Sequence, residues 1–126
     1  MSIQIDSSCE KLTEGIIGAA FEVANVLGHG FLEVIYRKAL LHELVLRGFS
    51  TRQEVPFQIT YKGAAMGCYV ADLVVENRVI VELKAVEGLN GHHVGQLLNY
   101  LKASRTEVGL LLNFGKPRLE FKRVLR

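Results

Sequence analysis

Two short apolar segments of the chain carry three ionisable side chains whose spacing suggests a shared site. These are Asp72 in residues 70–75, and Glu82 and Lys84 in residues 79–84. Side chains alternate between the two faces of a β-strand, so these even-numbered positions share one face if both segments are strands. If residues 76–78 form a three-residue turn, Asp72 lies opposite Glu82 at the open end of a hairpin, and Lys84 lies beside them. A two-residue turn would place the two carboxylates on opposite faces.

Two neighbouring carboxylates on a sheet need a strong compensating cation, because burying an unpaired carboxylate is costly. A divalent metal ion accepts oxygen ligands from both, can activate water and can stabilise charge on a phosphate. Lys84 would then orient the nucleophile or neutralise developing negative charge. The simpler interpretation is a buried salt bridge among Asp72, Glu82 and Lys84. One lysine cannot fully neutralise two carboxylates, so we favour the metal site, although spacing alone leaves both interpretations open.

The hydrophobic pattern predicts the elements that must position these residues, in the order ααβββαββ. A capping box at Ser7-Ser8-Cys9-Glu10 begins the first helix, Gly48 ends the second, and Lys62-Gly63 forms a turn. We expect helices over residues 7–27, 31–47 and 91–103, and strands over 51–61, 69–75, 79–84, 108–112 and 118–124. This order predicts a three-layer α/β domain in which helices flank a mixed sheet.

The apolar residues of the predicted strands indicate where the core lies. The odd-numbered positions of the hairpin from Ala71 to Leu83 are apolar outside the turn and are expected to form one core face. Residues 108–112 are apolar on both faces, as in a central strand, whereas residues 118–124 alternate weakly, as in an edge strand.

Composition indicates one globular domain over residues 1–126, with 49% hydrophobic and 22% charged residues. Cys9 and Cys68 have no metal-ligand spacing, no apolar run is long enough to span a membrane, and the N-terminus lacks a signal peptide's basic start, so we expect a cytoplasmic protein. From Lys102 onward the chain has seven basic and two acidic residues. This basic segment is either a phosphate-binding surface or a solvated edge strand.

Two motifs carry a resemblance to a known group of enzymes. Asp72, followed after nine residues by Glu82-Leu83-Lys84, resembles the PD-(D/E)xK nuclease superfamily, although Ala71 stands where the superfamily has its proline. Gly30, Glu33 and Tyr36 match the GxxExxY signature of a small bacterial-type family within it. The similarity continues through residues 99–102 to 113–115 and covers nearly the whole chain.

The resemblance implies a PD-(D/E)xK nuclease-like fold and a set of site residues. Asp72 and Glu82 would be metal ligands, Glu33 an additional ligand, and Lys84 catalytic. Gln96 and Tyr100 resemble the QxxxY motif of the RecB-like branch, which implies contact with the metal site or with DNA. The implied activity is hydrolysis of nucleic-acid phosphodiesters with Mg²⁺, for which Mn²⁺ would substitute.

The substrate and partners are less sharply indicated than the site. DNA is favoured over RNA as substrate, and action as a homo-oligomer or with a partner protein fits the small size of the chain. The alternative is a non-catalytic nucleic-acid-binding or protein-interaction module that keeps the nuclease fold. Two further roles stay open: Tyr36 is a core residue or stacks on a base, and one of His92 and His93 faces the site or caps the third helix.

Overall fold

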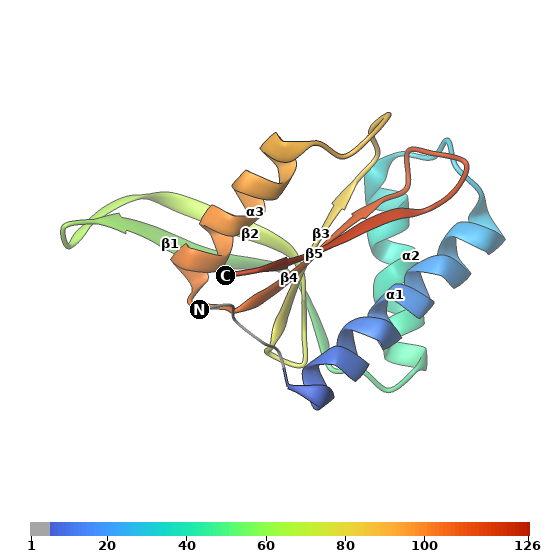
Figure 1. The fold of residues 1–126 in the computed structure, drawn as a ribbon, viewed down its shortest axis with the longest axis horizontal. Coiled ribbons are helices and arrows are strands. Elements are labelled where there is room, and N and C mark those ends of the chain that lie inside the picture. Colours follow the sequence, from blue (N-terminus) through green and yellow to red (C-terminus); the bar gives the residue numbers. More distant parts are fainter. Residues whose placement is uncertain (1–5) are drawn as a thin grey trace.

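The computed structural model describes residues 6–126 as three layers, in which a five-stranded sheet lies between α1 and α2 on one side and α3 on the other (Figure 1). The predicted order of elements is confirmed. None of the helices within residues 6–126 is long and apolar enough to cross a membrane. The elements are α1 (Ser7–Leu27), α2 (Glu33–Leu46), β1 (Thr51–Tyr61), β2 (Ala64–Val75), β3 (Val79–Lys84), α3 (Gly91–Ser104), β4 (Val108–Asn113) and β5 (Glu120–Leu125).

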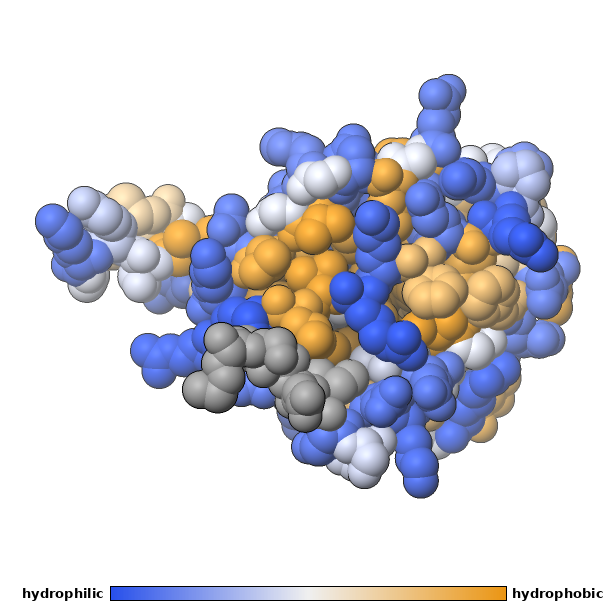
Figure 2. Space-filling model, viewed as in Figure 1, coloured by the Kyte–Doolittle hydropathy of each residue, from blue (hydrophilic) through white to orange (hydrophobic). Residues whose placement is uncertain are grey.

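The β1–β2 hairpin is longer than the sequence predicts. The second strand begins at Ala64 instead of residue 69, because pairing with β1 extends the ladder through small, exposed residues that give no alternation signal. The predicted turn is confirmed, with left-handed φ angles of 49° at Lys62 and 84° at Gly63. The tip of the hairpin therefore stands clear of the body of the molecule (Figures 1 and 2).

The sheet has the strand order β1-β2-β3-β4-β5, in which only β3 and β4 pair in parallel. All six residues of β4 are buried and β5 lies at an edge, so both assignments from the sequence are confirmed. Gly109 of β4 allows α3 to pack closely, because a Cβ there would lie 2.9 Å from the Leu97 side chain.

The two faces of the sheet support separate hydrophobic clusters. Leu73, Val79 and Val81 pack against α1 and α2, whereas Ile80 and Ala71 pack in the cluster that includes α3. The expectation that every odd-numbered residue of the hairpin shares one face is therefore wrong at Ala71. The side chains of β2 change from one face of the sheet to the other at Asp72. The neighbouring strand β1 is distorted at the same place, because Glu54 is unpaired there and has a φ of 52°.

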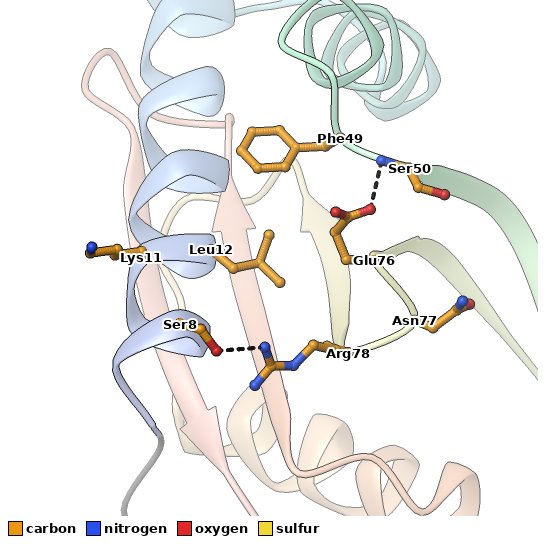
Figure 3. Close-up of a pocket in the computed structure, with 8 residues that line it drawn as sticks. All are labelled: Ser8, Lys11, Leu12, Phe49, Ser50, Glu76, Asn77 and Arg78. Carbon is orange, nitrogen blue, oxygen red and sulfur yellow. Dashed lines mark hydrogen bonds between the residues drawn. The ribbon is translucent and has the colours of Figure 1, made fainter.

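The turn between β2 and β3 has the three residues that the sequence predicts. Val75 pairs with Val79, and both Glu76 and Asn77 adopt a φ of 53°. The backbone N–H of Ser50 donates to the Glu76 carboxylate at 2.9 Å, at the edge of a hollow of about 620 Å³ beside the turn (Figure 3). This anchored turn fixes the register of the hairpin.

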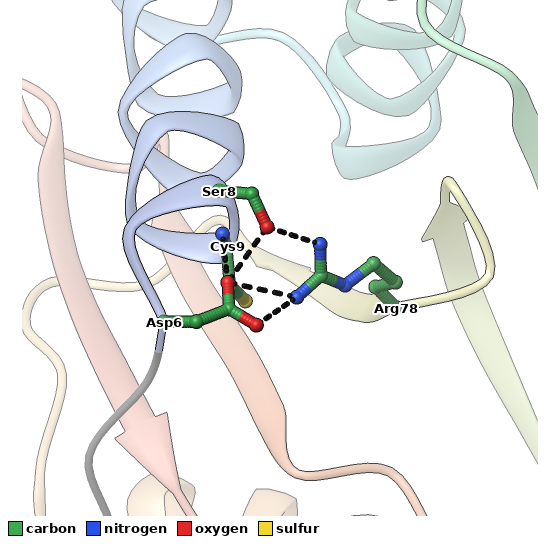
Figure 4. A network of polar contacts seen from close by, with 4 residues as sticks. All are labelled: Asp6, Ser8, Cys9 and Arg78. Atoms are coloured by element: carbon green, nitrogen blue, oxygen red, sulfur yellow. Dashed lines mark hydrogen bonds and ion pairs between the residues drawn. The ribbon is translucent and has the colours of Figure 1, made fainter.

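The first turn of α1 is anchored to the same hairpin. Its N-cap is Asp6, whose carboxylate accepts the N–H of Cys9 at 2.8 Å, so the predicted capping box at Ser7 is wrong by one residue. The Arg78 guanidinium donates to Asp6 at 3.1 Å and to Ser8 at 2.9 Å (Figure 4). Hydrogen bonds from Ser8, Cys9 and Arg78 lower the pKa of Asp6 to about 2. The network ties α1 to the β2–β3 turn.

The helix α2 differs from its prediction in its start and in its apolar face. It begins at Glu33 instead of Phe31, and it buries Tyr36, Leu40 and Leu44. The helical spacing of the sequence predicts an apolar stripe of Val34, Leu40, Leu41, Leu44 and Val45, but Val34 and Val45 are exposed. Tyr36, which that stripe leaves out, is buried instead, in the hydrophobic cluster that α1 and α2 form with the sheet.

The segment Asn113-Phe114-Gly115 clamps the chain that leaves β3. The Phe114 N–H donates to the Lys84 carbonyl at 2.9 Å, and the Asn113 side chain both accepts from the N–H of Val86 and donates to its carbonyl, each at 3.0 Å. A Cβ on Gly115 would lie 2.3 Å from the Val86 nitrogen, so only glycine fits there. The clamp fixes the backbone beside Lys84.

We expect Gly115→Ala to destabilise the domain, because the added methyl group meets backbone atoms that cannot rotate away. The expected loss in free energy of unfolding is roughly 1–3 kcal/mol, the usual cost of overpacking. Chemical denaturation measures it. Gly88→Ala is the control, since a Cβ there meets nothing within 4 Å. Equal stability of the two variants would contradict the clamp.

Candidate metal centre

Asp72 and Glu82 meet at the open end of the β2–β3 hairpin, as the sequence predicts. The β2–β3 ladder ends at the Leu73–Val81 pair, and Asp72 and Glu82 are the next residues along the two strands. Their carboxyl groups lie within hydrogen-bonding reach of each other. The Asp72 carboxylate also accepts the N–H of Leu83 at 2.9 Å, which fixes its orientation toward β3.

The two carboxyl groups are strongly coupled. Glu82 is only 8% exposed. Burial, followed by the hydrogen bond and the charge of Asp72, raises the pKa of Glu82 to about 9; the Tyr69 hydroxyl and Lys84 lower it only in part. Without an added cation, Glu82 therefore holds a proton at neutral pH.

Lys84 lies close enough to affect the carboxyl groups of this site but forms no salt bridge with them. Its positive charge lowers the pKa of both Glu82 and Glu33. Within residues 6–126, the salt bridges join Arg37 to Glu54, Arg47 to Glu43 and Arg78 to Asp6, and none involves Lys84. The described part of the chain thus lacks the salt bridge of the simpler interpretation.

A tyrosine pair connects the carboxylates to α3. The buried Tyr69 hydroxyl donates to Glu82, and the Tyr69 ring stacks on Tyr100 with centroids 3.6 Å apart. Burial, and then the nearby Glu82, raise the pKa of Tyr69. Tyr100 therefore reaches the site through Tyr69, whereas Gln96 lies beside Tyr100 in a groove along α3. Sequence reasoning missed Tyr69, because strand alternation places it with Ala71 on the face opposite Asp72, and the change of face at Asp72 was not predicted.

Glu33 lies at the first residue of α2 and faces Asp72 across a cleft. The cleft is lined by Glu33, Val34, Arg37, Asp72 and Leu83. Burial and the charge of Asp72 raise the pKa of Glu33, while Lys84 and Arg37 lower it. Arg37 was not identified from the sequence; its position one helical turn after Glu33, at i+4, is the signal that could have found it.

The remaining candidates have structural roles. Tyr36 is buried, its hydroxyl donates to the Gly28 carbonyl at 2.7 Å, and its ring stacks on Phe114 at 4.7 Å. It is thus a core residue that holds the loop before Glu33. His93 accepts the N–H of Asn90 at 3.1 Å and so caps α3.

The donor set at the open end suits a hard divalent cation, because it consists of the oxygens of two neighbouring carboxyl groups, where burial and then Asp72 raise the pKa of Glu82 to about 9. Within residues 6–126, no three His, Cys, Asp or Glu side chains lie close enough together to hold a metal ion, so Glu33 does not join Asp72 and Glu82 in a closed ligand set. Two carboxylates are nevertheless sufficient, since Mg²⁺ commonly keeps several waters and binds through one or two carboxylates and substrate oxygens.

In the presence of a chelator, stability should fall as pH rises between about 4.5 and 9. The pKa of Glu82 is raised from 4.5 in the unfolded chain to about 9 in the folded protein, so between these values the folded protein binds the proton more tightly than the unfolded chain does. The free energy of unfolding therefore falls as pH rises from about 4.5 to about 9. Melting temperature measured against pH tests this. Glu82→Gln should flatten the profile; a wild-type slope in that variant would contradict the assignment.

Comparison with known proteins agrees with this geometry. No curated protein matches the chain. A solved structure titled "Crystal structure of SSO0001" is similar with a TM-score of 0.52 and 19% sequence identity, over 90% of this chain and 77% of that one, which supports the fold. The sequence profile of a family described as the PD-(D/E)XK nuclease superfamily matches residues 10–124. With nearly its whole length covered by that profile, the chain belongs to the PD-(D/E)XK nuclease superfamily.

Proposed function

We propose that this protein is a nuclease that hydrolyses phosphodiester bonds with the help of Mg²⁺, for which Mn²⁺ would substitute, and that DNA is favoured over RNA as its substrate. The observation that carries the proposal is the contact between the Asp72 and Glu82 carboxyl groups, where burial and then the hydrogen bond and charge of Asp72 raise the pKa of Glu82 to about 9. A cation that bound both would remove this repulsion, so the site gains most from a metal ion. Membership of the nuclease superfamily supports the same function.

In this proposal each side chain around the cleft has a separate role. Asp72 and Glu82 would hold the ion, and Glu33 would act as an additional ligand from α2 through a bridging water. The bound ion supplies an activated water and stabilises charge on the phosphate. The Tyr69 hydroxyl orients the Glu82 carboxyl group. Gln96 and Tyr100 contact the nucleic acid.

Lys84 supplies a positive charge that no carboxylate within residues 6–126 consumes in a salt bridge. It is free to orient the nucleophile or to neutralise charge that develops during hydrolysis. Arg37, which pairs with Glu54 at 2.9 Å, also lines the cleft with Glu33 and Asp72, where the rest of its guanidinium can contact a phosphate. The clamp formed by Asn113 and Phe114 holds the backbone beside Lys84 in place.

We also assign the chain to the GxxExxY group within the superfamily. The motif has a coherent role here: Tyr36 bonds to the Gly28 carbonyl and accepts the Phe31 N–H at 3.2 Å, so it fixes the loop that delivers Glu33 to the cleft. Gly30 lies in that loop with a φ of 114°, a conformation that favours glycine. Gly30 and Tyr36 therefore act together to position the carboxylate of the third motif residue, Glu33.

Mn²⁺ or Mg²⁺ should raise the melting temperature, because an ion that binds only the folded state stabilises it. At a concentration 100 times Kd, the gain is about 2.7 kcal/mol, on the order of 10 °C for a domain of this size. Asp72→Asn should lose most of this shift and Glu33→Gln a smaller part. Glu22→Gln, on the exposed face of α1, is the control. An undiminished shift in Asp72→Asn would rule out Asp72 as a ligand.

The Lys84→Ala variant separates catalysis from ion binding, because a positively charged lysine does not ligate a metal ion. We expect the variant to fold and to keep its metal-induced shift in melting temperature. Its cleavage activity should fall by roughly 10²-fold or more. Cleavage of single- and double-stranded DNA and RNA with Mn²⁺ measures this, and Lys11→Ala on the exposed surface of α1 is the control.

The same variant tests the two competing interpretations. A folded Lys84→Ala protein with wild-type cleavage would refute the catalytic role. Destabilisation by roughly 3–5 kcal/mol would instead favour a structural role for the Lys84 charge, because its loss would leave the buried carboxyl groups uncompensated. If the wild type binds nucleic acid and metal but cleaves none of the substrates, the chain is a non-catalytic binding module.

A further inference from the structure

Arg37 of α2 does not form the ion pair that its place on the helix favours. Glu33 lies four residues before it, and a glutamate four residues on the N-terminal side of a basic residue is a favourable arrangement on a helix. The same arrangement does form a pair later on α2, where Arg47 donates to Glu43 at 2.6 Å. Arg37 instead donates to Glu54 of β1 at 2.9 Å. A contact from another element therefore determines where the charge of Arg37 lies.

Glu54 occupies an irregular position beside the candidate metal centre. The residue pairs on either side of it place Glu54 opposite Asp72 on the neighbouring strand, although the two do not pair. Its φ of 52° is unfavourable for a residue that has a side chain. An exposed ion pair contributes little stability, and 58% of the Glu54 side chain is exposed, so the contact with Arg37 does not offset this strain. Strain of this kind is typical of functional sites.

The Arg37 guanidinium lies close to carboxylates that are candidates for holding a metal ion. It lines one cleft with Glu33 and Asp72. Only 19% of the Arg37 side chain is exposed, and its buried Nε–H has no hydrogen-bond partner within residues 6–126. A buried donor without a partner is unfavourable, so a carboxylate of the cleft that accepted this N–H would be a better partner. The ion pair with Glu54 is the contact that opposes such a move.

We propose that Glu54 is a positioning residue, which holds the Arg37 guanidinium away from Glu33 and Asp72 and so leaves these carboxylates free for the metal ion. The proposal rests on the metal centre of the proposed function and adds the residue that keeps a competing cation from its ligands. When Glu54 loses its charge, Arg37 turns to a carboxylate of the cleft, and a metal ion must displace it in order to bind. Glu54 acts only through Arg37, so its effect on metal binding disappears when Arg37 is absent.

A double-mutant cycle separates this positioning from the loss of one negative charge near the site. Glu54→Gln removes the charge, Arg37→Gln removes its partner, and a third variant carries both substitutions. The Kd for Mn²⁺ is measured on each full-length protein from the electron paramagnetic resonance of free Mn²⁺. A purely electrostatic effect of Glu54 would weaken binding equally with and without Arg37, whereas positioning weakens it only when Arg37 is present.

We expect Glu54→Gln to raise the Kd for Mn²⁺ by roughly fivefold or more in the wild-type background, and by less than about twofold in the Arg37→Gln background. Glu54→Gly should give the same result and should fold at least as well as the wild type, since glycine adopts a positive φ without strain. Glu43→Gln is the control, because it removes an ion pair of the same kind from α2 outside the cleft. Equal effects of Glu54→Gln in both backgrounds, or no effect in either, would overturn the proposal.

The position of Arg37 is also measured without metal. In EDTA, nuclear Overhauser effects should place the Arg37 side chain beside β1 in the wild type and beside Glu33 or Asp72 in Glu54→Gln. Unchanged contacts of Arg37 in Glu54→Gln would overturn the proposal.

The outcomes distinguish this proposal from the proposed nuclease function. If the cycle and the contacts behave as expected but the wild type with Mn²⁺ cleaves no nucleic acid, the positioning role stands and the nuclease function fails. If the wild type cleaves, and Glu54→Gln binds Mn²⁺ and cleaves as the wild type does, the nuclease function stands and the positioning role is overturned. A wild type that binds no Mn²⁺ would overturn both.

Discussion

The position of every candidate catalytic group depends on the register of one hairpin. A turn of three residues, Glu76 to Arg78, makes Val75 the partner of Val79 and so brings Asp72 and Glu82 together at the open end. Deleting one residue of this turn would move one carboxylate to the other face. Contacts from outside the hairpin hold the turn: Arg78 bonds to Asp6 and Ser8 at the start of α1, and Glu76 accepts the Ser50 N–H. The end of the hairpin farthest from the chemistry therefore determines the geometry of the site.

This geometry imposes a local cost, because two carboxyl groups share a largely buried position and one of them must hold a proton when no cation is bound. Neighbouring groups reduce the free-energy cost of burying the two carboxyl groups but do not remove it. Asp72 accepts the Leu83 N–H, and Glu82 accepts the Tyr69 hydroxyl, so each acid has one neutral donor. Neutral donors orient the acids but do not cancel two charges. The arrangement is thus stable enough to fold and still favours a cation.

The sequence was sufficient to predict the pairing of Asp72 with Glu82, because strand alternation and turn length are local properties. It also predicted the element order and the central position of β4. Prediction from the sequence failed where the local structure depends on a residue that is distant along the chain. The change of strand face at Ala71 accompanies a distortion at Glu54 on another strand, and Asp6 caps α1 while pairing with Arg78 from the hairpin. The motif residue Tyr36 was ambiguous for the same reason, since its partners Gly28 and Phe114 come from different parts of the chain.

Side chains from all three layers gather at the candidate metal centre. The carboxylates lie on the sheet, and each flanking layer contributes different side chains to them. From one side, α2 contributes Glu33 and Arg37 in the cleft with Asp72. From the other, α3 contributes Tyr100, which contacts Glu82 only through Tyr69. The change of face at Asp72 makes this arrangement possible, because β2 then presents Leu73 to the α1–α2 layer and Tyr69 to α3 on either side of one carboxylate. The irregularity that the strand pattern did not predict is therefore the feature that opens the site to both layers.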